Sequence, residues 1–67
     1  MITIYLNGEK REISADTDLV ALLELFSLSV QRVAIEVNAE VVKRSDWPKT
    51  KVHDGDRLEI VHFVGGG

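Results

Sequence analysis

A chain of 67 residues with 45% hydrophobic and 28% charged side chains has the composition of one small globular domain. A domain of this size buries only about 60% of its unfolded surface, which disfavours a deep catalytic cleft. The net charge is −3, and because Lys and Arg are scattered, nucleic acid is not an expected partner. The sequence contains no cysteine, which excludes disulfides and Cys-based zinc sites.

The chain opens with a pattern that predicts a β-hairpin. Residues 2–6 alternate apolar and polar side chains, which is typical of a half-buried strand. Asn7-Gly8 follows, and Asn-Gly is the strongest short signal for a hairpin turn. Residues 9–14 are therefore expected to form a second, more polar strand, with Ile13 as its clearest inward residue.

A helix is predicted next. Asp16, Thr17 and Asp18 are three successive candidates for the helix N-cap, since their side-chain oxygens can accept from free backbone N–H groups. The apolar residues that follow lie at helical spacing, and they are Leu19, Leu22, Leu23 and Phe26. Residues 27–31 are expected to form a loop.

The third strand is predicted over residues 32–38. Val33, Ile35 and Val37 lie on one face of it, as alternation requires. Asn38-Ala39 is a plausible tight turn, and residues 40–43 are expected to return as a short fourth strand.

The last third of the sequence is expected to contain one more strand. Residues 44–48 form an irregular connection, with one short helical turn ended by Pro48 as an alternative. Trp47 is interpreted as a packing residue, with an interface role as the alternative. Residues 54–56 read Asp-Gly-Asp and predict a turn, after which residues 57–64 form the final strand.

The order of these elements is strand, strand, helix, strand, strand, strand, which predicts an α+β fold of the β-grasp type. One mixed sheet is expected to pack on a single main helix, with the first and last strands side by side. Residues 1–64 are assigned to this domain and residues 65–67 to a flexible tail.

The sequence also predicts a cytoplasmic protein. No stretch approaches the roughly 20 apolar residues that span a bilayer. Met1 leads directly into an alternating apolar pattern, without the basic and apolar regions of a signal peptide.

The run Gly65-Gly66-Gly67 is the segment that folding does not explain. Three glycines bury no side chain and lose the most backbone entropy on ordering. They offer a thin strip of backbone that ends in a carboxylate, which is ionised at neutral pH. Attack of the Gly67 carboxylate on ATP in a partner's active site gives an acyl-adenylate, and a sulfur nucleophile converts it to a thiocarboxylate. The alternative is a linker remnant or a frayed end.

A docking face for such a partner is predicted beside the tail. Three residues span at most about 10 Å, so an enzyme acting on Gly67 must sit close to the end of the last strand. If Leu58 and Ile60 point into the core, the outward residues of the same strand are Glu59, Val61 and Phe63. Tyr5 is expected beside them on that face. The alternative is that these side chains only satisfy the β-propensity of an exposed sheet.

Several segments together resemble the ThiS family, the sulfur carriers of thiamine biosynthesis. They read Val33-Ala34-Ile35-Glu36-Val37-Asn38, Val41-Val42-x-Arg44-x-x-Trp47, Val52-x-Asp54-Gly55-Asp56-x-Leu58-Glu59-Ile60-Val61 and Val64-Gly65-Gly66-Gly67. The resemblance covers nearly the whole chain. Its most discriminating part is Asn38 with the Arg44-x-x-Trp47 motif, because paired terminal glycines are shared by all ubiquitin-like carriers.

The resemblance implies a ubiquitin-like fold and a role as cosubstrate rather than enzyme, with no catalytic residue, metal or cofactor of its own. An E1-like adenylyltransferase, ThiF, would activate Gly67 with ATP and magnesium, while Gly65 and Gly66 thread into that partner. A cysteine desulfurase relay would supply sulfur, and thiazole synthase, ThiG, would receive it. The free carrier is expected to be a monomer.

Two alternatives to this function stay open. The small subunit of molybdopterin synthase resembles ThiS in fold and tail, but members of that family tend to carry prolines before the glycines, and residues 62–65 have none. A passive ubiquitin-like binding module is the second. A metal site is not expected, because His53 and His62 are isolated, with no third ligand at suitable spacing.

Overall fold

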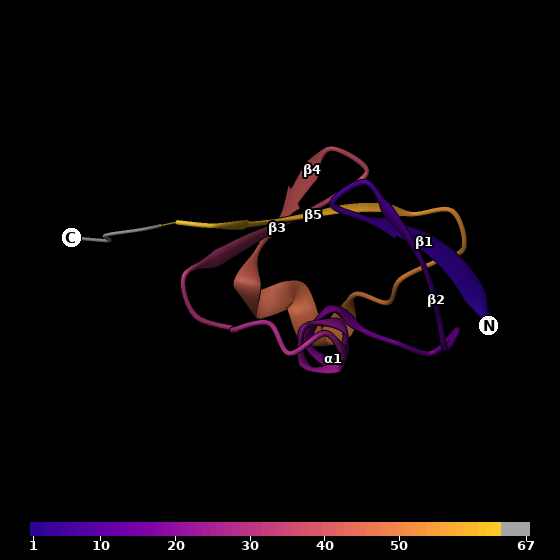
Figure 1. Ribbon diagram of the computed structural model, residues 1–67. Coiled ribbons are helices and arrows are strands. Elements are labelled where there is room, and N and C mark those ends of the chain that lie inside the picture. The colour runs from indigo at the N-terminus through magenta and orange to yellow at the C-terminus, as the bar shows by residue number, and fades with distance from the viewer. Residues whose placement is uncertain (64–67) are drawn as a thin grey trace.

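The computed structural model of this chain describes residues 1–63, which form one sheet with its helices on one side (Figure 1). The elements in chain order are β1 (Ile2–Leu6), β2 (Glu9–Ile13), α1 (Leu19–Leu25), β3 (Val33–Val37), β4 (Glu40–Val42), the 3-10 helix η1 (Arg44–Lys49) and β5 (Arg57–His62). The predicted tail Gly65, Gly66 and Gly67, together with the predicted strand end at Val64, lies outside the described residues.

The sheet is mixed, with the strand order β2-β1-β5-β3-β4. β1 and β5 lie side by side, as expected for the first and last strands. They run parallel, and the other neighbours are antiparallel. The pairing of β5 with β3 is long and extends from Val37↔Leu58 to Val33↔His62. β5 is therefore the middle strand, between the hairpin β1–β2 and the hairpin β3–β4 (Figure 1).

Within residues 1–63, one α-helix covers one face of this sheet (Figure 1). Asp18 is its N-cap, and the carboxylate of Asp18 accepts a hydrogen bond from the backbone N–H of Ala21 at 2.9 Å. Leu19, Leu22 and Leu23 are fully buried, and Phe26 packs against the same core. The predicted helical face is thus confirmed. None of the helices within residues 1–63 has the length and apolar character needed to cross a membrane.

The connection after β4 differs from the expectation that Pro48 ends a helical turn. Pro48 lies inside η1, which continues to Lys49. Proline fits there because its fixed φ is compatible with a 3-10 helix and only one backbone donor is lost. The segment also holds Trp47, which is 3% exposed and donates from Nε1 to the carbonyl of Val42 at 3.0 Å. The packing role of Trp47 is confirmed.

Both hairpin turns place residues in the left-handed region of backbone space. The φ angles are 49° at Asn7 and 84° at Gly8, then 52° at Asn38 and 71° at Ala39. Two successive positive φ values match the twist of a two-residue hairpin. Ala39 is the costly member, because its Cβ crowds the backbone in this conformation.

We therefore expect Ala39→Gly to stabilise the domain. The substitution removes the strain at residue 39, but glycine also raises the entropy of the unfolded chain. The free energy of unfolding should therefore rise by about 0.5–1 kcal/mol. Urea denaturation measures it. The matched control is Ala34→Gly inside β3, where the same exchange should cost ~0.5–1 kcal/mol. Equal losses in both variants would contradict strain at Ala39.

The segment that leads into α1 is held by the segment that follows η1. The backbone N–H of Leu19 donates to Thr50 at 3.0 Å, and that of Val52 donates to Thr17 at 2.9 Å. The ammonium group of Lys51 also contacts the carboxylate of Asp16. This hydrogen bond and charge lower the pKa of Asp16 and raise the pKa of Lys51. Both side chains are exposed, so the pair adds little stability.

Candidate docking face and the end of the last strand

An apolar patch lies on the sheet face opposite α1, at the C-terminal end of β5. Val61 and Phe63 are 48% and 49% exposed there, while Leu58 and Ile60 point into the core as expected. Ala34 is the partner of Val61 in the β3–β5 register, so it lies beside Val61 on the same face. We call Ala34, Val61 and Phe63 the β5-end patch. Its exposure suits a docking surface, and docking itself stays a prediction.

The structure separates Tyr5 from this patch. Tyr5 is 39% exposed on the same face, but its register partner is Arg57, four residues before Val61. At about 3.3 Å per residue this places the two levels roughly 13 Å apart. Tyr5 instead borders an open depression that Gly8, Gly55, Arg57 and Glu59 also line. Tyr5 therefore lies near Glu59 on the expected face, but the expectation that it also lies beside Val61 and Phe63 is wrong. Alternation fixes the face of a side chain but not its register.

Between Tyr5 and the patch, the outer face is acidic. Glu36 and Glu59 are direct partners across β3 and β5, where like charges repel. Both line a second depression, which Arg57 shares with the turn at Asn38 and Ala39. The uncovered face thus presents apolar groups at the end of β5 and two carboxylates behind them.

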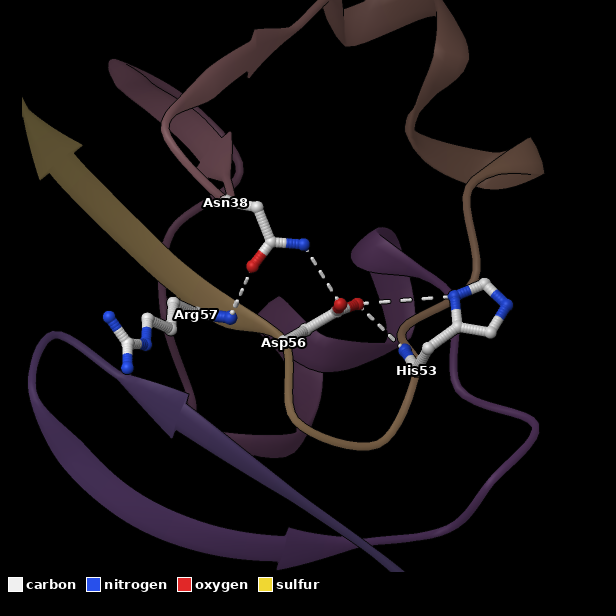
Figure 2. A network of polar contacts seen from close by, with 4 residues as sticks. All are labelled: Asn38, His53, Asp56 and Arg57. Atoms are coloured by element: carbon white, nitrogen blue, oxygen red, sulfur yellow. Dashed lines mark hydrogen bonds and ion pairs between the residues drawn. The ribbon is translucent and has the colours of Figure 1, made fainter.

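A polar network fixes the start of β5 (Figure 2). The Asp56 carboxylate accepts from the Asn38 side-chain amide at 3.0 Å and from the backbone N–H of His53 at 2.8 Å. The side-chain oxygen Oδ1 of Asn38 accepts from the backbone N–H of Arg57 at 3.0 Å. The Nδ1 edge of the His53 ring faces the Asp56 carboxylate at 4.0 Å, which is beyond hydrogen-bond distance (Figure 2). The network joins two turns to one strand, which is a structural role.

Asn7 supports β5 from its other side. Its backbone N–H donates to Leu58 at 2.8 Å, and its side-chain oxygen accepts from the N–H of Ile60 at 2.8 Å. Its side-chain amide also donates to the carbonyl of Ile60 at 3.3 Å. The backbone turns away from β5 at Asn7. The Asn7 side-chain amide therefore makes the hydrogen bonds to β5 that the next peptide group of β1 would otherwise have made. The sequence predicted Asn7 only as a turn residue.

Beyond Ile60, the backbone of β5 is held from the side of β3. The N–H of Phe63 donates to the carbonyl of Arg32 at 2.9 Å, one step past the pair Val33↔His62. Phe63 is the last described residue before the predicted tail. The backbone of β5 is therefore held at Asn7 on one side and at Arg32 on the other, as far as Phe63.

The described residues offer no metal centre. Among residues 1–63, no three His, Cys, Asp or Glu side chains are grouped so that they could hold an ion. His53 and His62 are both exposed.

A mixed five-stranded sheet packed on one α-helix, with parallel first and last strands, defines a ubiquitin-like β-grasp domain. Comparison with known families is more specific, because the sequence model of the ThiS family matches residues 4–67. The chain belongs to the ThiS family. The match includes all three residues of the glycine run.

Individual relatives agree with this assignment. The sulfur carrier protein ThiS of Bacillus subtilis is 35% identical over 65 residues, which cover 96% of this chain and 98% of that protein. A crystal structure of the thiamine biosynthesis protein ThiS from Geobacter metallireducens superposes with a TM-score of 0.88 at 29% identity, covering 98% of this chain and 100% of that one.

A second kind of relative is much longer. A thiazole synthase of Paramagnetospirillum magneticum is 44% identical over 64 residues, which cover 96% of this chain but 20% of that protein. The chain therefore spans about a fifth of the length of the thiazole synthases that it matches.

Proposed function

We propose that this chain is a sulfur carrier of thiamine biosynthesis and that the carboxylate of Gly67 is the group that carries sulfur. The observation that carries the proposal is the match to the ThiS family over residues 4–67, which includes the glycine run. The same match favours the thiamine branch over the small subunit of molybdopterin synthase.

The chemistry needs an activating partner. The Gly67 carboxylate attacks the α-phosphorus of ATP, pyrophosphate leaves, and a glycyl adenylate forms. Hydrosulfide then attacks the acyl carbon, and AMP leaves. A persulfide can attack in the same way, and a thiol then reduces the S–S bond of the resulting acyl disulfide. The product is a thiocarboxylate at Gly67. The chain is thus a cosubstrate rather than a catalyst, and the ATP and magnesium belong to the activating partner.

The proposed partners are an E1-like adenylyltransferase of the ThiF type, a cysteine desulfurase relay and thiazole synthase. The last is supported by relatives named thiazole synthase that contain a segment similar to this chain. Because activation consumes ATP, the proposal places the carrier in the cytoplasm. Gly65 and Gly66 then serve as the lead that threads Gly67 into a partner, since glycine has no Cβ to obstruct a narrow channel.

Docking is proposed to use the β5-end patch, with Glu36 and Glu59 facing cationic groups of the partner. An apolar centre with charged groups around it is the usual anatomy of a protein interface. Opposite charges across it would raise the rate of association and fix its register. Tyr5 lies at the far end of the same face, so it contacts only a partner that extends over the acidic pair.

We expect Val61→Asp to raise the Kd for the E1-like partner at least about 10-fold, because it places a charge in the apolar centre of the interface. Isothermal titration calorimetry measures the change. Leu25 is the control, since it is 58% exposed and lies on α1, on the opposite side of the sheet. Leu25→Asp should leave Kd within about two-fold. Equal weakening by both variants would argue against docking at the β5-end patch.

Intact mass spectrometry tests the function itself. The carrier is incubated with ATP, magnesium, the E1-like partner and sulfide. A mass gain equal to the difference between sulfur and oxygen, located at Gly67 by fragmentation, is the expected result. If the partner binds but no adduct forms at Gly67, the chain is a binding module and the carrier proposal is wrong.

A further inference from the structure

The Arg44-x-x-Trp47 motif has no part in the function proposed above, yet its side chains are tightly placed. Trp47 is buried, with its indole N–H bonded to the carbonyl of Val42. The guanidinium carbon of Arg44 lies 4.5 Å from the centroid of the Trp47 ring. This is the distance of a cation–π contact, and it holds the flat guanidinium group against a fixed surface.

From that position Arg44 reaches the segment that precedes β3. Its guanidinium group donates to the carbonyl of Val30 and, at 3.4 Å, to the carbonyl of Val33. We call residues 30–33 the strap. Between its two anchored carbonyls lies Arg32, whose φ of 59° is in the left-handed region. A residue with a Cβ is strained there, so the strap needs external bonds to keep this shape.

The strap in turn holds the end of β5. The carbonyl of Arg32 accepts from the backbone N–H of Phe63, as described above. A series of contacts therefore runs from Trp47 through Arg44 and the strap to Phe63, the last described residue. Its effect is to fix the orientation of one peptide group, that of Arg32, on which the last described hydrogen bond of β5 depends.

We infer that Arg44 is a positioning residue, which sets through the strap the direction in which the chain leaves the sheet at Phe63. This inference rests on the proposed function, because the direction matters when Gly67 must be delivered into a partner's active site. The tail residues that follow Phe63 are few, so an error in direction at Phe63 is carried directly to the reacting carboxylate.

Arginine is suited to this role and lysine is not. A guanidinium group can stack on the indole and donate to two carbonyls at once, because its donors lie in one rigid plane. An ammonium group keeps the charge and can contact the ring, but it offers no planar fork. Arg44→Lys should therefore give an intermediate effect, and Arg44→Met should remove both the charge and the donors.

The test compares Arg44→Met and Arg44→Lys with the wild type in two measurements. Hydrogen exchange followed by NMR should show the Phe63 amide exchanging about five-fold faster in Arg44→Met, the effect of one lost hydrogen bond. The Ile35 and Leu58 amides report on the fold and should stay unchanged. In adenylation by the E1-like partner, kcat should fall about five-fold with the KM for the carrier unchanged, because docking is intact and delivery is not.

Lys43→Met is the matched control, since it removes one positive charge at the neighbouring exposed position, where Lys43 caps η1 without a side-chain hydrogen bond. It should resemble the wild type in both measurements. Should Arg44→Met fail to fold, Arg44→Lys carries the test, because the stacked cation remains. Wild-type exchange at Phe63 in a folded Arg44 variant overturns the inference, and so does a rise in KM instead of a fall in kcat. Failure of the proposed function gives a different result, because the wild-type chain would then not be adenylated. The hydrogen-exchange measurement would still decide the role of Arg44.

Discussion

Appending one alanine after Gly67 is expected to lower adenylation at least about 100-fold, because the new carboxylate is displaced from the site in which Gly67 reacts. The free energy of unfolding should change by less than ~0.5 kcal/mol, since the addition lies beyond the packed domain. Pyrophosphate exchange with the E1-like partner measures the rate, and urea denaturation measures the stability.

Binding of the extended chain supplies the control for this experiment. Its Kd for the partner should remain near the wild-type value, because the β5-end patch is unchanged. Activation of the extended chain at the wild-type rate would show that Gly67 is not the reacting residue. Loss of both binding and activation would show that docking depends on the terminus itself.

Leu22→Ala is expected to have the largest effect on stability. Leu22 is fully buried on α1, and its truncation should cost roughly 2–5 kcal/mol through lost burial and the cavity left behind. A domain of this length has a total stability of only about 3–10 kcal/mol, so most of the folded population could be lost. Unfolding in urea is followed by the fluorescence of buried Trp47.

The control for this substitution lies on the same helix. Leu25 is 58% exposed, so Leu25→Ala removes the same atoms from a position that the core does not need. Its cost should stay within ~0.5 kcal/mol. Similar losses for Leu22 and Leu25 would mean that α1 does not pack on the sheet through the face described here.

Alternation and helical spacing predicted the strands and the helix well, because the burial of one face sets the order of apolar and polar residues within each element. Val33, Ile35, Leu58 and Ile60 lie inside as expected, and Val61 and Phe63 lie outside. Register could not be obtained in this way. It depends on which residues of two distant strands pair, and the level of Tyr5 at Arg57 follows from a parallel pairing between the two ends of the sequence.

The contacts that the sequence did not reveal are those between side chains and distant backbone groups. Asn7 bonds to Ile60 across 53 positions, and Arg44 bonds to the strap across 11 and 14 positions. Such bonds produce no periodic pattern in the sequence, because each one requires only a single polar side chain. Asn7 could therefore be assigned only to its turn, and Arg44 only to a motif typical of the family.

The central place of β5 makes the fold depend on the strand that comes last in the described sheet. Without residues 57–62, the hairpin β1–β2 and the hairpin β3–β4 would share no strand, and an isolated hairpin is at best marginally stable in water. A nascent or truncated chain would therefore stay unfolded until β5 is present. The proposed docking face lies on that same strand, so fragments that lack β5 and the glycine run are not expected to bind the proposed partners.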